Sequence, residues 1–239
     1  MMKTSELKSE ARALMIGKYG FFATFILIYY VSSLIATAIP SAIFPGIDLP
    51  AVNMVLRFVL SFLLLVIVNL IKVGIARAAF GTVFEKETSL RDIFYAFGND
   101  RDAFLKIEML LSAIQSGISL LLVFFEHLNE VYSFDVWEYY GLYIVFSALI
   151  LVLNLAVTLR LTFAVYVIMD QPGIGALPAL RASLILTKRK YFRYLFFRLS
   201  FAGMYILGYL SMLIGFLYVL PYIETSVCLY YKGLSRQVC

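Results

Sequence analysis

Residues 51–79 read AVNMVLRFVLSFLLLVIVNLIKVGIARAA, a stretch that is apolar at most positions. A helix needs about 20 mostly apolar residues to cross the roughly 30 Å of hydrocarbon in a bilayer. Because this stretch is longer than that, it predicts a membrane-spanning helix. Arg57 and Lys72 lie on either side of its centre, from which their long side chains can extend to opposite interfaces.

The composition of the whole chain indicates the same class of protein. The chain has 239 residues, of which 62% are hydrophobic and 15% charged, and its mean hydropathy is +0.90. A soluble domain averages roughly 45–50% apolar and about 25% charged residues. We therefore expect one all-α membrane domain over residues 1–239, a polytopic helical bundle. The net charge of +5 is typical of bases held on the cytoplasmic side, and we expect no nucleic-acid partner.

Further apolar runs predict additional spans. The first four spans are predicted at residues 21–39, 51–79, 104–125 and 140–169. Residues 194–234 contain no polar loop and are too long for one crossing, but about right for two. Their reversal is predicted near residues 212–216, where Gly215 offers a break. We therefore predict six transmembrane helices, with five spans and a re-entrant end as the alternative.

Basic residues are distributed unequally between the predicted loops. Residues 40–50 and 126–139, the predicted outer loops, contain no Lys or Arg, whereas the termini and the other loops are rich in both. Because an excess of Lys and Arg marks the cytoplasmic side, we predict a cell-membrane protein with both termini in the cytoplasm.

A threefold pattern precedes the first, third and fifth predicted spans. Each copy begins with a leucine and a base, and an aromatic residue opens the span that follows. Apolar residues at i, i+4 and i+7 from each leucine predict an amphipathic helix at the membrane interface, and Ser89 with Asp92 predicts a capping box in the second copy. We predict three repeats of an amphipathic helix and a transmembrane hairpin. The leucines are Leu7, Leu90 and Leu180, the aromatics are Phe21, Phe104 and Tyr194, and the units cover about residues 5–79, 89–170 and 179–234.

Short motifs occur from Asp170 onward. They are Asp170 with Pro172, Ala179-Leu180-Arg181 with Ser183, Leu199-Ser200-Phe201, Gly215-Phe216-Leu217-Tyr218, Pro221-Tyr222 and Tyr230-Tyr231. On these residues, and more loosely on the N-terminal ELKSEARALMIGKYG, the chain resembles an uncharacterised bacterial membrane family, domain of unknown function 975. It departs from that family at Lys188-Arg189-Lys190, where a Gly-Asn-like turn is expected, and at Tyr218, where tryptophan is usual. The resemblance implies a multi-pass bacterial membrane protein and no established activity.

Ionisable residues inside spans are costly to bury and are therefore candidate functional residues. Glu224 lies in the last predicted span, and its expected partners are Arg160 and Arg198. Glu108, near the start of the third span, is a further candidate. These residues form either an ion pair that holds helices in register or a site that binds a substrate or a proton.

The bases beside the predicted spans are expected to contact anionic lipid headgroups on the cytoplasmic side. They are Lys8, Arg91, Arg181, Lys188, Arg189, Lys190 and Arg193. The chain has no glycine-rich phosphate loop, zinc-binding helix motif or paired-cysteine motif, and its single histidine, His127, lies in a predicted outer loop. We therefore expect no catalysis, no cofactor and no metal.

Two functions follow from these patterns. The first is a non-catalytic membrane module that interacts with lipid or docks a partner protein. The alternative is a small transporter, exporter or lipid flippase with an intramembrane Glu/Arg site, handling a peptide or a lipid. The alternative requires a polar cavity open to one side with Glu224 on its wall, whereas dry, sealed contacts around Glu224, Arg160 and Arg198 would exclude it.

Overall fold

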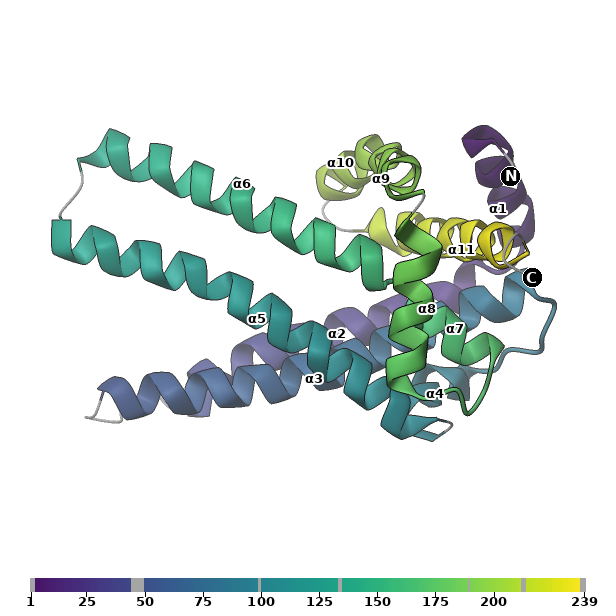
Figure 1. The fold of residues 1–239 in the computed structure, drawn as a ribbon, viewed down its shortest axis with the longest axis horizontal. Coiled ribbons are helices and arrows are strands. Elements are labelled where there is room, and N and C mark those ends of the chain that lie inside the picture. Colours follow the sequence, from purple (N-terminus) through teal and green to yellow (C-terminus); the bar gives the residue numbers. More distant parts are fainter. Residues whose placement is uncertain are drawn as a thin grey trace.

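A computed structural model describes residues 3–43, 50–98, 100–132, 135–188, 190–211 and 214–236. Every regular element in these ranges is a helix, which confirms the all-α prediction. Four helices dominate the molecule and run along its long axis (Figure 1). They are α2 (Tyr19–Ile43), α3 (Pro50–Val83), α5 (Arg101–Tyr132) and α6 (Val136–Leu161).

These helices are apolar and long enough to cross a bilayer. The candidate spans are Tyr19–Pro40, Val55–Val83, Arg101–Asn129 and Val136–Asp170, the last of which continues from α6 into α7 (Phe163–Asp170). Only 6% of the apolar window in Val136–Asp170 is buried within the protein. An apolar surface of this extent needs a cover, and lipid supplies it for a spanning helix.

The long helices form two hairpins, α2–α3 and α5–α6. Figure 1 shows the ends of α2 and α5 and the starts of α3 and α6 at one end of the molecule, and α1 and the end of α11 at the other. The sequence predicted the termini on one side of the membrane and residues 40–50 and 126–139 on the other; the described ends of the long helices are consistent with this polarity, and the orientation in a membrane stays a prediction.

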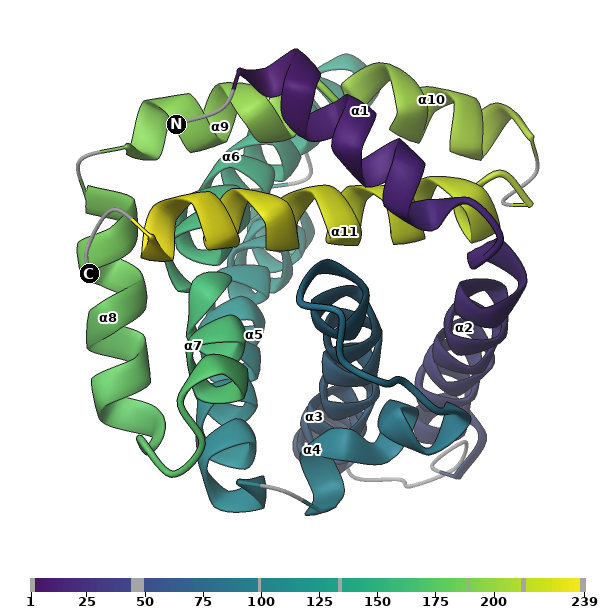
Figure 2. The same cartoon turned by 90° about the vertical axis from the view of Figure 1, so that its right-hand side faces the viewer.

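The shorter helices gather at the end that holds the termini, and we call this layer the cap. Figure 2 shows α9, α10 and α11 running across the ends of the long helices. The cap comprises α1 (Thr4–Met15), η1 (Leu90–Phe94), α4 (Tyr95–Gly98), α8 (Ala176–Lys188), α9 (Tyr191–Leu199), α10 (Ala202–Leu210) and α11 (Phe216–Ser235), together with α7.

Six spans are not confirmed, because residues 194–234 are divided among three cap helices. Helices α9 and α10 have 9 residues each, or about 14 Å, half the thickness of the hydrocarbon core. Helix α11 has 20 residues, but most of its side chains are buried, and it packs on α1, α2 and α3. The break before α11 was predicted correctly: α10 ends at Leu210 and α11 begins at Phe216, while residues 212 and 213 lie outside the described part.

The helices that precede the predicted spans bury different faces. In α1, Leu7 is buried against the protein. In η1, Leu90 and Phe94 are exposed instead, and Ile93 is buried. The capping box of η1 is present, since the Ser89 backbone N–H donates to Asp92 Oδ2 at 2.9 Å. The three-repeat architecture is not confirmed and stays a prediction.

A charged cavity beneath the cap

A cavity of about 90 Å³ lies where the long helices meet the cap. Helices α3, α5 and α6 with α7 form its walls, and α9 and α11 each contribute one charged side chain. The space admits several water molecules. It is lined by Asn69, Lys72, Val73, Ala76, Glu108, Leu111, Gln115, Thr158, Leu161, Thr162, Val165, Tyr166, Arg198 and Glu224.

Four of the lining residues carry charge: Lys72, Glu108, Arg198 and Glu224. Lys72 is exposed, Arg198 and Glu224 are half-buried, and Glu108 is only 7% exposed. Within the described part of the chain, no nitrogen of a base lies within 4.0 Å of a Glu108 or Glu224 oxygen. The ion pair considered from the sequence is therefore absent, and the charges face one another across the cavity.

The charges are nevertheless close enough to interact in two couples. Lys72 acts electrostatically on Glu108, and Glu224 acts on Arg198. Burial lowers the pKa of Arg198, but Tyr194, Glu224, Tyr205 and Tyr166 together raise it, so the net change in this pKa is upward and the guanidinium stays charged. The Tyr166 hydroxyl donates to Glu224 Oε2 at 3.2 Å, which orients that carboxylate.

The junction of α6 and α7 forms part of the cavity wall. The Thr162 hydroxyl donates to the Thr158 carbonyl one turn earlier, and α6 passes into α7 at Thr162, whose backbone is α-helical. This bond satisfies the Thr162 hydroxyl within its own helix. Both threonines line the cavity.

Arg160 does not join this site, contrary to the expectation from its depth in the span. It is exposed, and its guanidinium carbon lies 5.4 Å from the centroid of the Tyr191 ring. Successive residues on a helix point about 100° apart, so Arg160 faces away from its cavity-lining neighbours Thr158 and Thr162. The sequence predicted how deep Arg160 lies along its span, but not the face of α6 on which its side chain lies.

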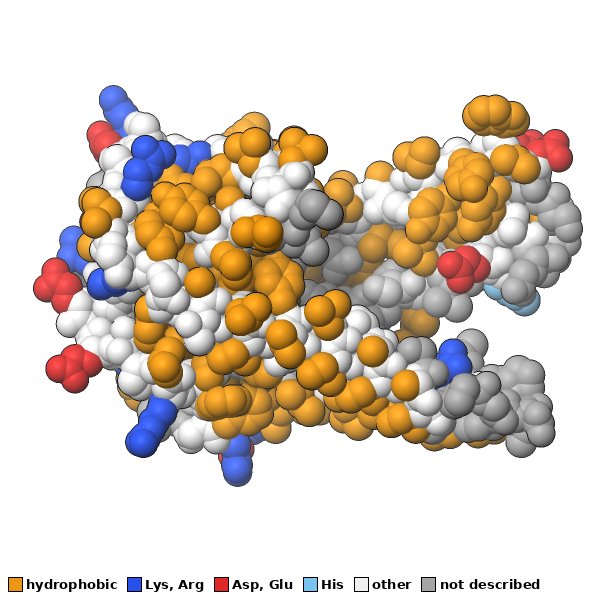
Figure 3. All heavy atoms as spheres, turned by 180° about the vertical axis from the view of Figure 1, so that it is seen from behind, with side chains coloured by type: hydrophobic (Ala, Val, Ile, Leu, Met, Phe, Trp, Pro, Cys, Tyr) orange, Lys and Arg blue, Asp and Glu red, His pale blue; other side chains and the backbone are white. Residues whose placement is uncertain are grey.

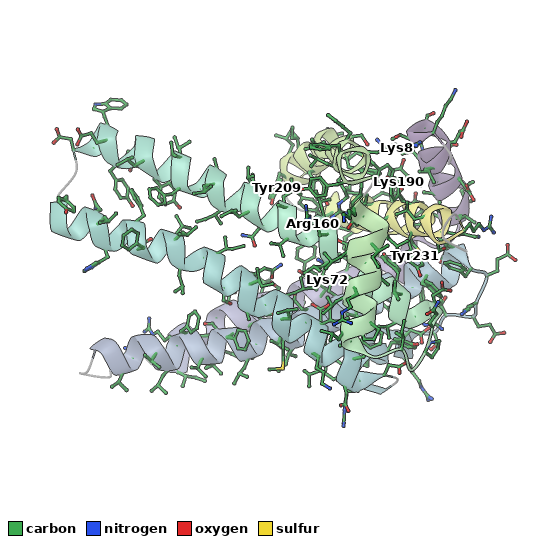
Figure 4. The ribbon with its side chains drawn as sticks, viewed as in Figure 1. Lys8, Lys72, Arg160, Lys190, Tyr209 and Tyr231 are labelled. Carbon is green, nitrogen blue, oxygen red and sulfur yellow. The ribbon has the colours of Figure 1, made fainter. Side chains whose placement is uncertain are left out.

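Arg160 instead belongs to a separate depression of about 530 Å³, which we call the basic pocket. Figure 4 shows Arg160 and Lys190 close together at the base of the cap. No acidic residue is among the described residues that line the pocket. They are Arg160, Lys188, Lys190, Tyr191, Phe192 and Arg193.

The other predicted headgroup contacts have different positions. Arg91 and Arg181 are exposed outside the basic pocket, and Arg189 lies outside the described residues. Lys8 binds another part of the protein instead of facing a headgroup, because its ammonium donates to the Ser200 carbonyl at 2.8 Å.

Sequence reasoning missed Lys72 and Tyr166 as parts of the cavity. A signal for Lys72 was present: Asn69, Lys72 and Ala76 recur at helical spacing and form one less apolar face of α3. The Asn69 amide donates to Ser112 Oγ on α5 at 3.0 Å and thereby links α3 to α5 at the cavity.

Nearly the whole chain matches one known protein family. Residues 1–238 match the family described as a protein of unknown function, DUF975. The chain belongs to this family. No curated protein and no solved structure matched the chain. The resemblance noted in the C-terminal third thus extends over nearly the whole DUF975 chain.

Two of the motif residues of this DUF975 chain join α11 to α7 within the cap and the cap helix α8 to the long helix α6. The Tyr231 hydroxyl donates to Asp170 Oδ2 at 3.0 Å and thereby links α11 to α7. The Ser183 hydroxyl donates to the Arg160 carbonyl at 2.7 Å and links α8 to α6. These motif residues have structural partners that account for their residue types.

Proposed function

We propose that this chain is a non-catalytic multi-pass membrane protein whose cap binds anionic lipid headgroups on the cytoplasmic side. Four candidate spans and a cap rich in bases support this placement. Figure 3 shows most of the Lys and Arg side chains of one face at the cap end, with apolar side chains covering the long helices. A base excess on the cytoplasmic side is the usual arrangement.

The observation that carries the proposal is the basic pocket. Arg160, Lys188, Lys190 and Arg193 come from α6, α8 and α9 and converge on one depression. Bases near an anionic membrane surface contribute about 1 kcal/mol each to lipid binding. Phe192, which is 72% exposed, stands beside them and supplies an apolar anchor for the acyl region.

The test is lipid retention measured by native mass spectrometry on the purified protein. We expect R160Q/K188Q to lose bound phosphatidylglycerol severalfold relative to the wild type. The matched control is R91Q/R181Q, which removes two exposed bases outside the pocket and should retain the lipid. Equal losses of lipid in the two double variants would mean that binding depends on the positive surface of the cap in general and not on the basic pocket.

A second function, a small transporter, exporter or lipid flippase, is favoured by the charged cavity. A purely structural charge cluster is expected to close into direct ion pairs, because each unpaired charge in a low-dielectric interior is costly. Here Glu108, Glu224, Lys72 and Arg198 border an open space without direct pairing. Reconstituted liposomes carrying a fluorescent lipid would test it, since E108Q should slow lipid translocation if the cavity lies on the route.

A further inference from the structure

We propose that the charged cavity and an adjoining cleft form one binding site for a zwitterionic phospholipid. The head group, with one ammonium and one phosphate, occupies the cavity, and the acyl chains leave through the cleft into the bilayer. This inference deepens the second proposed function and rests on the cavity being a ligand site.

The charges around the cavity match a ligand of both signs. The two carboxylates and two cations come from four different helices: Lys72 from α3, Glu108 from α5, Arg198 from α9 and Glu224 from α11. Their formal charges cancel, so neither a simple anion nor a simple cation is favoured. An ammonium fits beside the carboxylates, and the planar guanidinium of Arg198 suits a phosphate, which it can bind through two hydrogen bonds.

Glu108 supplies an independent argument for a ligand. Glu108 is only 7% exposed, yet no described residue donates a hydrogen bond to its carboxylate. A buried carboxylate without donors is costly. Because Glu108 lines the cavity, a donor held in that space, such as a ligand ammonium, would supply the missing hydrogen bond to its carboxylate.

A cleft of about 400 Å³ extends the site along the membrane. It lies between α3 on one side and α5 and α6 on the other, where the two hairpins diverge away from the cap (Figure 1) and the surface is hollowed between them (Figure 3). Gln115 lines both the cavity and the cleft, so the two spaces adjoin at this side chain. The cleft is lined by Phe58, Leu65, Gln115, Ser116, Ser119, Leu120 and Asn154.

The walls of the cleft suit the ester region and chains of a lipid. Phe58, Leu65 and Leu120 are apolar, while Ser119 and Asn154 are weakly polar because they already donate to carbonyls of their own helices, at 3.0 and 3.1 Å. Asn154 carries a second amide hydrogen that can donate to an ester oxygen. A free soluble zwitterion would leave this cleft without a role, and we therefore assign a lipid.

The experiment is native mass spectrometry of the full chain with phosphatidylethanolamine, phosphatidylglycerol and free phosphoethanolamine as probes. We expect the wild type to retain phosphatidylethanolamine and E108Q to lose it by about tenfold, the effect of one charge-assisted hydrogen bond. The control E126Q removes an exposed carboxylate from the same helix, outside the cavity and the cleft, and should bind as the wild type does.

The remaining outcomes separate the sites and the sources of the ligand. E108Q should keep phosphatidylglycerol in the basic pocket, and R160Q/K188Q should keep phosphatidylethanolamine in the cavity. Unchanged phosphatidylethanolamine retention in E108Q would overturn the inference, and so would binding of free phosphoethanolamine in place of the lipid. Removing an unsatisfied buried charge should not lower the melting temperature, so a folded E108Q is expected.

The same samples distinguish a failure of this inference from a failure of the proposed transport. If phosphatidylethanolamine is not retained but fluorescent lipid still crosses reconstituted membranes in a Glu108-dependent manner, the transport proposal stands and the zwitterionic ligand does not. If the protein neither retains phosphatidylethanolamine nor translocates lipid, the inference and the transport proposal are both wrong.

Discussion

Lys8 joins the two ends of the chain at the scale of a single residue. Its ammonium donates to the Ser200 carbonyl and lies 4.3 Å from the centroid of the Phe201 ring, while its own carbonyl accepts from the Tyr222 hydroxyl at 3.2 Å. Partial burial lowers the pKa of Lys8. The lysine therefore fastens α1 to the C-terminal helices, and the sequence could not distinguish this role from a headgroup contact.

We predict that K8A destabilises the protein by about 2 kcal/mol, through loss of a charged hydrogen bond and a cation–π contact. The measurement is the thermal unfolding midpoint in detergent. K18A is the control, since Lys18 is exposed beyond the end of α1. Equal midpoints for K8A and the wild type would mean that the contacts of Lys8 do not hold α1 in place.

The residues of the cavity show how far sequence reasoning reaches. The cost of burying charge in an apolar chain singled out Glu224, Arg198 and Glu108, and the structure brings all three to one cavity. The same reasoning grouped Arg160 with them and omitted Lys72. Both errors have one cause: depth along a helix follows from residue number, but the face on which a side chain lies depends on how the helices pack.

At the scale of elements, long apolar runs were reliable guides and the shorter helices were not. The run at 51–79 became α3 over Pro50–Val83, because a stretch longer than the bilayer has few alternatives. The region 194–234 has similar hydropathy for a different reason, since α11 is buried in protein rather than lipid. Pro221, Glu224 and Lys232 within α11 were the available signs.

The contact between α3 and η1 gives a prediction at this scale. A Cβ at Gly74 would lie 2.5 Å from the Ile93 backbone, so only glycine allows η1 to approach α3 this closely. We predict that G74A lowers stability by about 1–3 kcal/mol, because the backbone of η1 must shift. The measurement is thermal unfolding of the purified protein in detergent.

The matched control for Gly74 is Gly117 on α5, where a Cβ would meet nothing within 4 Å. G117A should leave stability unchanged or raise it by up to about 1 kcal/mol, as expected for alanine in place of glycine within a helix. A similar effect of both substitutions would show that helix propensity, and not the approach of η1, governs position 74.

At the scale of the whole molecule, the sequence predicted the class of protein and the side on which each loop and terminus lies, but it did not predict the cap. Composition indicated a helical membrane protein, and loop charges predicted residues 40–50 and 126–139 opposite the termini; Figure 1 shows the ends of α2 and α5 far from α1. The cap depends on contacts between distant segments, such as α1 with α11 and α7 with α8. One sequence carries no direct record of such contacts, and hydropathy treats a buried helix and a spanning helix alike.

The orientation of the protein in the membrane is predicted from the excess of bases at the cap end. It can be measured by labelling single cysteines. Cys228 is buried and should not react, so C239S provides the background. Glu126, toward the turn end of α5, and Glu87, between α3 and η1, are both exposed. Because the bases lie at the cap end, we predict that an impermeant maleimide labels E126C on intact cells and labels E87C only after permeabilisation. Labelling of E87C on intact cells, with E126C protected, would place the cap and its basic pocket outside, away from the cytoplasmic anionic lipid that the proposed function requires.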